Sequence, residues 1–173
     1  HPILNKRKKL MGYRGIAQDI SALKHREGKM INMAFYDSLT KLANRTHFID
    51  LLRSHLKSQT PENSLRPSAL LFIDLDGFKE INDNQGHETG DQLLKMIAQR
   101  MQNHARKTDL VGRLGGDEFA LLVPNVLCGS NPIVYIEKVI HDVQQCFKQT
   151  FQIADQEINL TTSIGVAIYP THG

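Results

Sequence analysis

Two apolar runs in the sequence each lie beside carboxylates and glycine. In the first, SALLFIDLDGFK, Asp74 and Asp76 end a stretch with the composition of a buried strand. In the second, RLGGDEFALLV, Asp117 and Glu118 follow two glycines and precede another apolar run. Sheets of α/β and α+β proteins usually place their chemistry at strand ends. These acids are therefore the first candidates for a site.

Carboxylates at the ends of neighbouring strands can share a divalent cation. Adjacent strands lie about 4.8 Å apart, which would bring Asp74 and Asp117 to one ion. The sequence has no His and Cys cluster with zinc-ligand spacing, so these oxygen ligands favour Mg²⁺. Because Mg²⁺ held by one or two carboxylates usually completes its shell with phosphate oxygens, the predicted substrate is a nucleotide.

The residues that follow the first strand suit a phosphate group. Gly77 allows close backbone approach, the amides of Gly77 and Phe78 at a helix start can cradle phosphate, and Lys79 can neutralise its charge. The sequence contains neither a Walker loop nor a dinucleotide fingerprint. The predicted phosphate site is therefore of another kind.

The two glycines of the second stretch predict a tight hairpin. Leu110–Leu114 and Phe119–Val123 are rich in β-prone residues and flank Gly115 and Gly116, which accept the positive φ angles of such a turn. A hairpin turn alone is usually solvated and inert, so that alternative stays open at this point.

Helices are expected around these strands. The sequence after Gly77 predicts a helical turn over Phe78–Asn82, broken at Gly86, and then a longer helix in which Thr89 or Asp91 could simply be caps. The other predicted elements are a helix over Thr46–Lys57, whose entry Asp37, Asn44 and Arg45 would clamp, a helix over Asn131–Phe147 and a strand over Glu157–Ile168.

Composition indicates one main globular domain with a shorter segment attached. The chain has 173 residues, of which 40% are hydrophobic and 23% charged, and a net charge of +3. The basic run Lys6–Lys9 lacks interleaved aromatic residues, so a solvated loop is favoured over a nucleic-acid patch. Cys128 and Cys146 are too far apart for a CxxC pair and indicate a reduced, cytoplasmic setting. No apolar stretch reaches the roughly 18 residues of a membrane span, so any anchor is expected outside this sequence.

The first 36 residues are expected to belong to a sensor and its connector. Residues 9–20 predict a strand with a glycine turn, and Gly15–Ser21 resembles the last strand of a PAS sensor domain, which would make residues 1–21 the end of such a domain. Residues 22–36 have a heptad-like apolar spacing. A short parallel coiled coil and a single amphipathic connector both fit that spacing.

The second stretch and its surroundings resemble the GGDEF domains, the family of diguanylate cyclases. Gly115–Phe119 matches the signature, and the likeness extends over Asp37–Arg45, Phe72–Asp91 and Ser163–Ala167. It implies an α+β, palm-type nucleotide cyclase fold over residues 37–173, with a central, mostly antiparallel sheet surrounded by helices. It also implies a homodimer in which each domain holds one GTP. Metal-assisted attack of a 3′-hydroxyl on an α-phosphate would join the two into cyclic di-GMP and release pyrophosphate.

The resemblance also implies roles for individual residues. The metal, Mg²⁺ with Mn²⁺ as the alternative, would be held by Asp74, the carbonyl of Leu75 and Asp117. Asp117 or Glu118 would help to deprotonate the attacking hydroxyl, and Lys79 would steady the phosphates. The substrate-binding residues that it implies are Gly77, Phe78, Gly116 and, on the guanine side, Asn82, His87 and Asp91. A carboxylate suits guanine, because it can accept from both N1–H and the exocyclic amine, which adenine cannot offer together.

Arg106 and Asp109 match the family's product-binding, inhibitory motif. The guanidinium would offer its planar fork to a guanine edge or phosphate of cyclic di-GMP, and Asp109 would accept from the base amine. The alternative is a local Arg–Asp surface pair with no function.

The sequence departs from the family pattern in two places. Lys41 and Ala43 stand where Gly and Pro are usual, a change expected to perturb only the loop. The sequence also ends at Gly173, where family members continue into a helical region whose basic residues touch the phosphates. An enzyme that makes cyclic di-GMP is therefore weighed against a module that binds GTP or cyclic di-GMP without turnover, such as the regulatory half of a cyclase–phosphodiesterase hybrid. The intact carboxylates favour the enzyme.

Overall fold

The computed structural model describes residues 2–13, 33–59, 67–126 and 131–171. The chain divides into two compact units, residues 1–31 and 32–173. In the first unit, β1 (Pro2–Leu4) pairs with β2 (Leu10–Tyr13) in an antiparallel hairpin. The strand expected within residues 9–20 is therefore present as β2. Residues 14–32 lie outside the described residues, so the PAS-like ending and most of the connecting helix stay predictions.

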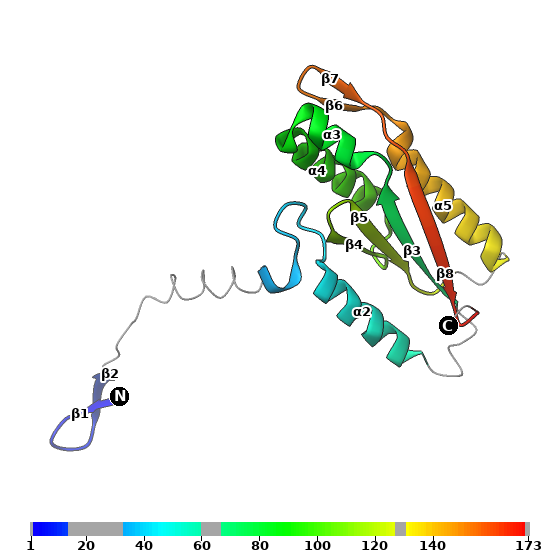
Figure 1. The fold of residues 1–173 in the computed structure, drawn as a ribbon. Coiled ribbons are helices and arrows are strands. Elements are labelled where there is room, and N and C mark those ends of the chain that lie inside the picture. Colours follow the sequence, from blue (N-terminus) through cyan, green and yellow to red (C-terminus); the bar gives the residue numbers. More distant parts are fainter. Residues whose placement is uncertain (1, 14–32, 60–66, 127–130, 172–173) are drawn as a thin grey trace. The chain divides into compact units, whose positions relative to one another are not determined.

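The second unit is built on a four-stranded antiparallel sheet (Figure 1). In spatial order, its strands are β4 (Leu110–Gly115), β5 (Glu118–Val123), β3 (Ser68–Leu75) and β8 (Thr162–Tyr169). The predicted hairpin is confirmed as β4 and β5. Because this sheet is accompanied by helices, the predicted α+β fold with an antiparallel central sheet is confirmed.

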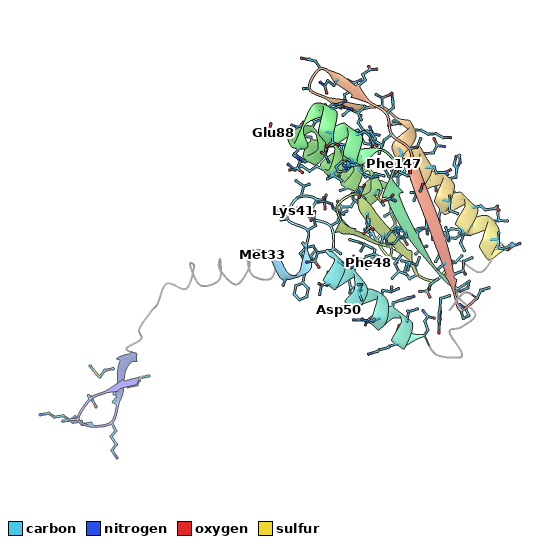
Figure 2. The ribbon with its side chains drawn as sticks, viewed as in Figure 1. Met33, Lys41, Phe48, Asp50, Glu88 and Phe147 are labelled. Carbon is cyan, nitrogen blue, oxygen red and sulfur yellow. The ribbon has the colours of Figure 1, made fainter. Side chains whose placement is uncertain are left out.

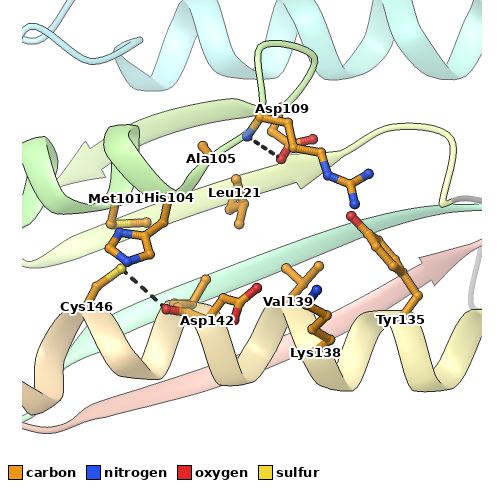
Figure 3. Close-up of a pocket in the computed structure, with 12 residues that line it drawn as sticks. Met101, His104, Ala105, Asp109, Leu121, Tyr135, Lys138, Val139, Asp142 and Cys146 are labelled. Carbon is orange, nitrogen blue, oxygen red and sulfur yellow. Dashed lines mark hydrogen bonds between the residues drawn. The ribbon is translucent and has the colours of Figure 1, made fainter.

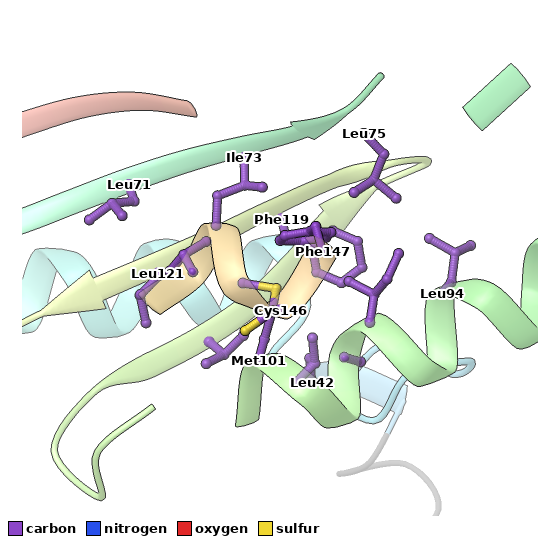
Figure 4. Packing of buried hydrophobic residues seen from close by; sticks show 14 of the residues in the cluster. Leu42, Leu71, Ile73, Leu75, Leu94, Met101, Phe119, Leu121, Cys146 and Phe147 are labelled. Atoms are coloured by element: carbon purple, nitrogen blue, oxygen red, sulfur yellow. The ribbon is translucent and has the colours of Figure 1, made fainter. Parts of the chain in front are cut away.

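Helices cover both faces of β5, which explains why its sequence is apolar throughout. Phe119, Leu121 and Val123 face a large core shared with α4 (His87–His104) and α5 (Pro132–Lys148), part of which is seen in Figure 4. The residues between them, Ala120 and Leu122, face a smaller core. There they meet Phe48 of α2 (Arg45–Ser58), which is labelled in Figure 2.

The predicted helices are confirmed with small shifts of their ends. The helix expected over Thr46–Lys57 is α2, and the one expected over Asn131–Phe147 is α5. The helical turn expected over Phe78–Asn82 runs on as α3 (Phe78–Gln85) and ends at Gly86, whose φ of 87° suits glycine. Among the described residues, every helix is too short or too polar to span a membrane.

The strand predicted over Glu157–Ile168 is wrong as a single element. A small hairpin, β6 (Phe151–Ile153) and β7 (Gln156–Ile158), comes first, and β8 begins only at Thr162. The predicted strand is interrupted before Thr162 because both the backbone and the side chain of Thr161 form hydrogen bonds with the loop after β3. Its carbonyl accepts from the amide of Asp76, and its hydroxyl donates to the Asp76 carboxylate.

The end of α5 is fixed by an arginine from α4. The Arg100 guanidinium donates to the carbonyl of Cys146 in the last turn of α5 and to those of Gln149 and Thr150 just beyond the helix. The same guanidinium stacks on the ring of Phe151, 3.7 Å from its centroid. Cys146 is free and buried, and this burial raises the pKa of its thiol. Cys128 lies outside the described residues.

Candidate active site

The strand register brings the acids of the two sequence stretches together. In the antiparallel pair of β3 and β5, Asp74 lies directly opposite Glu118. Opposed residues of an antiparallel pair point to the same side of the sheet, with Cβ atoms about 5 Å apart. Asp117 precedes Glu118 in the hairpin turn, where Gly115 and Gly116 have φ of 148° and 51°. The register therefore sets Asp74 opposite Glu118, and the glycines allow the turn that places Asp117 directly before Glu118 in the chain.

Within the described residues, no lysine, arginine or histidine forms an ion pair with these three carboxylates. The carboxylates of Asp74, Asp117 and Glu118 form no hydrogen bond or ion pair with another side chain of the part that the structure describes. Their oxygens are hard donors, and two carboxylates are as many as a protein usually gives Mg²⁺. A cluster of three or more His, Cys, Asp or Glu able to enclose a metal is absent from the described ranges. The donor set thus fits an open divalent site that a substrate completes.

The loop after β3 leads directly into a helix start. Gly77 has a left-handed φ of 74° and caps α3 without a side-chain hydrogen bond, so no protein side chain caps the first amides of the helix within the described ranges. Phe78 is buried and anchors the start of the helix, whereas Lys79 beside it is exposed. Uncapped amides at a helix start next to a lysine suit a phosphate group.

Asp76 has a different role from the neighbouring acids. Its carboxylate accepts hydrogen bonds from the hydroxyls of Thr161 and Ser163, at 2.7 and 2.8 Å. The bonds from Thr161 and Ser163 hold the pKa of Asp76 below its ordinary value. The carboxylate therefore ties the loop after β3 to the start of β8. Sequence reasoning missed this role, although Ser163 opens a segment that matched the family.

The residues expected on the guanine side lie on two packed helices. Asn82 is on α3, and His87 and Asp91 are on the first two turns of α4. A Cβ on Gly90 of α4 would collide with the Asn82 side chain, so Gly90 lets the helices approach there. The helix-cap alternative is wrong for these positions. The cap of α4 is Gly86, the Thr89 hydroxyl donates to the carbonyl of Gln85 instead, and Asp91 stays exposed.

The glycine turn is held by an arginine. Arg113 donates to the Gly116 carbonyl from two nitrogens, at 3.0 and 2.7 Å, and forms an ion pair with Asp37 at 3.1 Å. Asp37 also accepts from the amide and hydroxyl of Thr40, at 2.8 and 2.6 Å. Partial burial raises the pKa of Asp37, but the hydrogen bonds from Thr40 and Arg113 and the charge of Arg113 outweigh it, so the net shift is downward.

The predicted clamp of Asp37, Asn44 and Arg45 needs one correction. Asn44 does cap α2, because its side chain accepts from the amide of His47. Arg45 is exposed and has no side-chain partner among the described residues. The cation bound by Asp37 is Arg113 of β4, because the backbone of Ala43 pairs with β4 next to that residue, accepting from the amide of Arg113 at 2.9 Å.

A pocket of about 170 Å³ lies between the end of α4 and α5 (Figure 3). Its walls include Arg106 and Asp109 at the rim and Met101 and Leu121 deeper inside. Within the described residues, the Arg106 guanidinium and the Asp109 carboxylate form no ion pair. Asp109 accepts instead from the backbone amide of Arg106, at 2.9 Å, and from the hydroxyl of Thr108. The Arg106 guanidinium lies over the ring of Tyr135, 4.6 Å from its centroid.

Known proteins resemble this chain over most of its length. The family described as diguanylate cyclase, GGDEF domain, matches residues 34–173. The chain is 38% identical over 145 residues to MucR of Pseudomonas aeruginosa, named a bifunctional diguanylate cyclase/cyclic di-GMP phosphodiesterase, covering 84% of this chain and 20% of MucR. It is 36% identical over 151 residues to the diguanylate cyclase TpbB of the same species, covering 87% of this chain and 33% of TpbB. The chain thus spans a fifth to a third of these relatives.

Solved structures show the same architecture. The GGDEF domain of TpbB superposes with a TM-score of 0.70 at 36% identity, over 79% of this chain and 76% of that one. The coiled coil and GGDEF domain of DgcB from Caulobacter crescentus, in complex with c-di-GMP, gives 0.72 at 25% identity, over 86% and 76%. The fold is that of these GGDEF domains. The chain belongs to the GGDEF family of diguanylate cyclases, whose members generally use divalent metal ions.

Proposed function

We propose that this domain condenses two GTP into cyclic di-GMP and two pyrophosphates. The observation that carries the proposal is the register that sets Asp74 opposite Glu118, next to the uncapped start of α3. Carboxylates without a protein cation among the described residues, beside free helix amides, suit a metal-bound triphosphate. In the reaction, a 3′-oxygen of one GTP bonds to the α-phosphorus of the other, and the bond from that phosphorus to the pyrophosphate breaks.

The residues divide the work between metal and substrate. Asp74, the Leu75 carbonyl and Asp117 would hold the ion, Mg²⁺ or Mn²⁺, which when bound neutralises charge that develops on the phosphates. Glu118 or Asp117 takes the proton of the attacking hydroxyl. The phosphate oxygens are oriented by backbone amides and steadied by one lysine, a set made up of Gly77, Phe78, Gly116 and Lys79.

Guanine recognition is assigned to the helix pair α3 and α4. Asp91, exposed on α4, would accept from N1–H and the exocyclic amine of the base, while Asn82 and His87 would contact its other edge. Adenine offers no such pair of donors, so Asp91 would discriminate GTP from ATP.

One domain that holds one GTP must meet a second copy to complete the product. We therefore propose a homodimer as the active species, with residues 22–36 setting its geometry. The proposed location is the cytoplasm, where GTP is available. Cyclic di-GMP is proposed as an inhibitor that binds Arg106 and Asp109. The DgcB complex with c-di-GMP supports product binding within this family.

A second candidate is a regulatory domain that binds GTP without turnover. The similarity to MucR favours considering it, because MucR is named as a phosphodiesterase as well as a cyclase and this chain covers only a fifth of it. The two candidates differ in one measurable product. Turnover of GTP with Mg²⁺ yields cyclic di-GMP and pyrophosphate, whereas a binding domain yields neither.

The deciding experiment compares the unmodified protein with Asp117→Asn. We expect the variant to lose activity by several orders of magnitude while its circular dichroism is unchanged, because a metal-binding carboxylate is lost. Asp83→Asn, an exposed change on α3, is the matched control and should keep full activity. An active Asp117→Asn variant would overturn the metal assignment. If the unmodified protein binds GTP but makes no cyclic di-GMP, the enzymatic proposal fails and the regulatory candidate is supported.

A further inference from the structure

The side chain of Arg106 is held in place by the protein itself. Its guanidinium lies over the face of Tyr135 from α5, with the Cζ atom 4.6 Å from the ring centroid. Both residues line the pocket between α4 and α5, and the labelled Tyr135 points from its helix toward the opposite wall (Figure 3). A cation at this distance from an aromatic face is attracted by the ring.

This contact occupies only one part of the guanidinium. Its N–H groups have no hydrogen-bond acceptor and no ion-pair partner among the residues that the structure describes. The carboxylate of Asp109, the acid nearest in sequence, is turned to the backbone amide of Arg106. The planar fork and the face turned away from Tyr135 are therefore both available to a ligand.

Tyr135 is itself well supported. It is half-buried and packs against the main core of the domain, on a helix whose far end is fixed by Arg100. An aromatic ring on a rigid helix restricts a neighbouring arginine more than solvent or a flexible side chain would. The restriction matters for binding, because a free arginine must give up many rotamers when it binds a ligand.

We propose that Tyr135 is a positioning residue of the product site, holding the Arg106 fork toward the pocket so that it meets a guanine edge of cyclic di-GMP. The proposal rests on the proposed function, because it takes cyclic di-GMP as the ligand of Arg106. Tyr135 therefore affects the binding of cyclic di-GMP only through Arg106. It stacks on one face of the guanidinium and leaves the N–H groups of the fork free to meet the edge of the base.

The test is a double-mutant cycle measured by calorimetric titration with cyclic di-GMP. Tyr135→Leu keeps apolar bulk but loses the aromatic face, and we expect it to weaken binding about fivefold. Tyr135→Phe keeps the face and should bind as the unmodified protein does. Val134→Ala, at an exposed position on the same helix, is the matched control and should have no effect.

The cycle separates positioning from direct contact. Arg106→Ala should weaken binding about tenfold or more, and adding Tyr135→Leu to it should cost nothing further, because the partner through which Tyr135 acts is gone. A loss from Tyr135→Leu that is equally large without Arg106 would overturn the positioning role. So would unchanged affinity in the Tyr135→Leu single variant.

A measurement without ligand completes the test. In the free protein, the ring current of Tyr135 should shift the side-chain protons of Arg106 upfield, and Tyr135→Leu should remove that shift while the unfolding temperature stays nearly the same. Absence of the shift in the unmodified protein overturns the contact itself. If the shift is present but cyclic di-GMP does not bind at all, the product site of the proposed function fails, and the ligand assignment of Tyr135 fails with it.

Discussion

The proposed metal ligands lie beside two loops, Asp117 in the glycine turn and Asp74 and Leu75 at the end of β3, and different chemistry holds each loop. The glycine turn before Asp117 is tied by Arg113, which pairs with Asp37 while donating to the Gly116 carbonyl. The loop after Asp74 is tied by Asp76, which accepts from two hydroxyls at the start of β8. The first anchor is an ion pair with side chains only 12% and 21% exposed, whereas Asp76 is exposed.

This difference in burial indicates whether each anchor mainly affects the stability of the fold or the activity. Breaking a shielded ion pair leaves a poorly solvated charge behind, so the first anchor should be coupled to the stability of the fold. Losing hydrogen bonds to an exposed carboxylate leaves groups that water can satisfy. The second anchor should then affect local geometry and activity more than stability. The first anchor also joins the turn to Asp37, near the point where the chain enters the domain.

The largest expected effect comes from Asp37→Ala. The variant removes the partner of Arg113 and the acceptor of two Thr40 hydrogen bonds, so we expect the free energy of unfolding to fall by about 2–3 kcal/mol. Urea-induced unfolding followed by circular dichroism measures this loss. Asp50→Ala is a matched control, because its ion pair with Arg53 is 3.7 Å long with side chains 59% and 69% exposed.

The control should cost less than about 0.5 kcal/mol, as exposed pairs usually do. Equal losses in the two variants would break the comparison, since burial of the Asp37 pair would then have no consequence.

The second expected effect concerns activity rather than stability. Asp76→Ala frees the loop that carries Gly77 and the Leu75 carbonyl, so we expect GTP turnover to fall about tenfold or more, because small displacements of positioning groups are costly in catalysis. The melting temperature should change little. Thr161→Val, which removes one of the two donors, should give a smaller loss in the same assay.

An exposed acid without a role sets the baseline for that experiment. Asp83→Ala on α3 should leave both turnover and melting temperature unaltered. If Asp76→Ala instead unfolds the domain while Asp37→Ala does not, the assignment of the two anchors is reversed.

The sequence predicted the parts of the site that depend on local residue types. Gly115 and Gly116 between two β-prone runs are enough to place a hairpin, and the apolar run before Asp74 is enough to place a buried strand. The turn and the strand end could therefore be predicted from the sequence alone, together with the acids that they carry.

The two anchors could not be predicted in this way. Asp37 and Arg113 are 76 positions apart, and Asp76 and Ser163 are 87 apart, so neither pairing leaves a periodic signal in the sequence. The sequence suggested the neighbouring Arg45 as the partner of Asp37, because without a structure a partner can be predicted only among residues nearby in the chain. Sheet register, which sets Asp74 opposite Glu118, likewise depends on distant pairing.

Acid pH offers a third, smaller test of the comparison. The pKa of Asp37 is held below its ordinary value of 3.8, so its contribution to stability is complete above that value and is lost as the pH falls through the lower pKa of the folded state. We expect the stability difference between the unmodified protein and Asp37→Asn to shrink below about pH 4. Thermal unfolding at a series of pH values measures it.

Asp76 serves as the internal comparison in the same series. Its pKa is also lowered, by the Thr161 and Ser163 hydroxyls, but it is exposed. The stability difference between the unmodified protein and Asp76→Asn should therefore shrink in the same direction in acid, but it should be smaller than that of Asp37→Asn. A difference for Asp37→Asn that grows as the pH falls would contradict the expected direction of the effect.

The smallest expected effect lies in the turn that carries the Asp37 anchor. Lys41 has a left-handed φ of 64°, a conformation in which a Cβ is strained. Lys41→Gly should therefore stabilise the domain by up to about 1 kcal/mol, less the contribution of the bond from Lys41 Nζ to the Ser38 carbonyl at 2.7 Å.

Lys41→Ala is the control, because it loses the same bond but keeps the strained Cβ. Urea unfolding should show that the glycine variant is more stable than the alanine variant. Because the amide of Lys41 donates to the Asp37 carbonyl, relief of strain at position 41 should also stabilise the ion pair of Asp37 with Arg113. An alanine variant as stable as the glycine variant would mean that the left-handed turn costs this chain nothing.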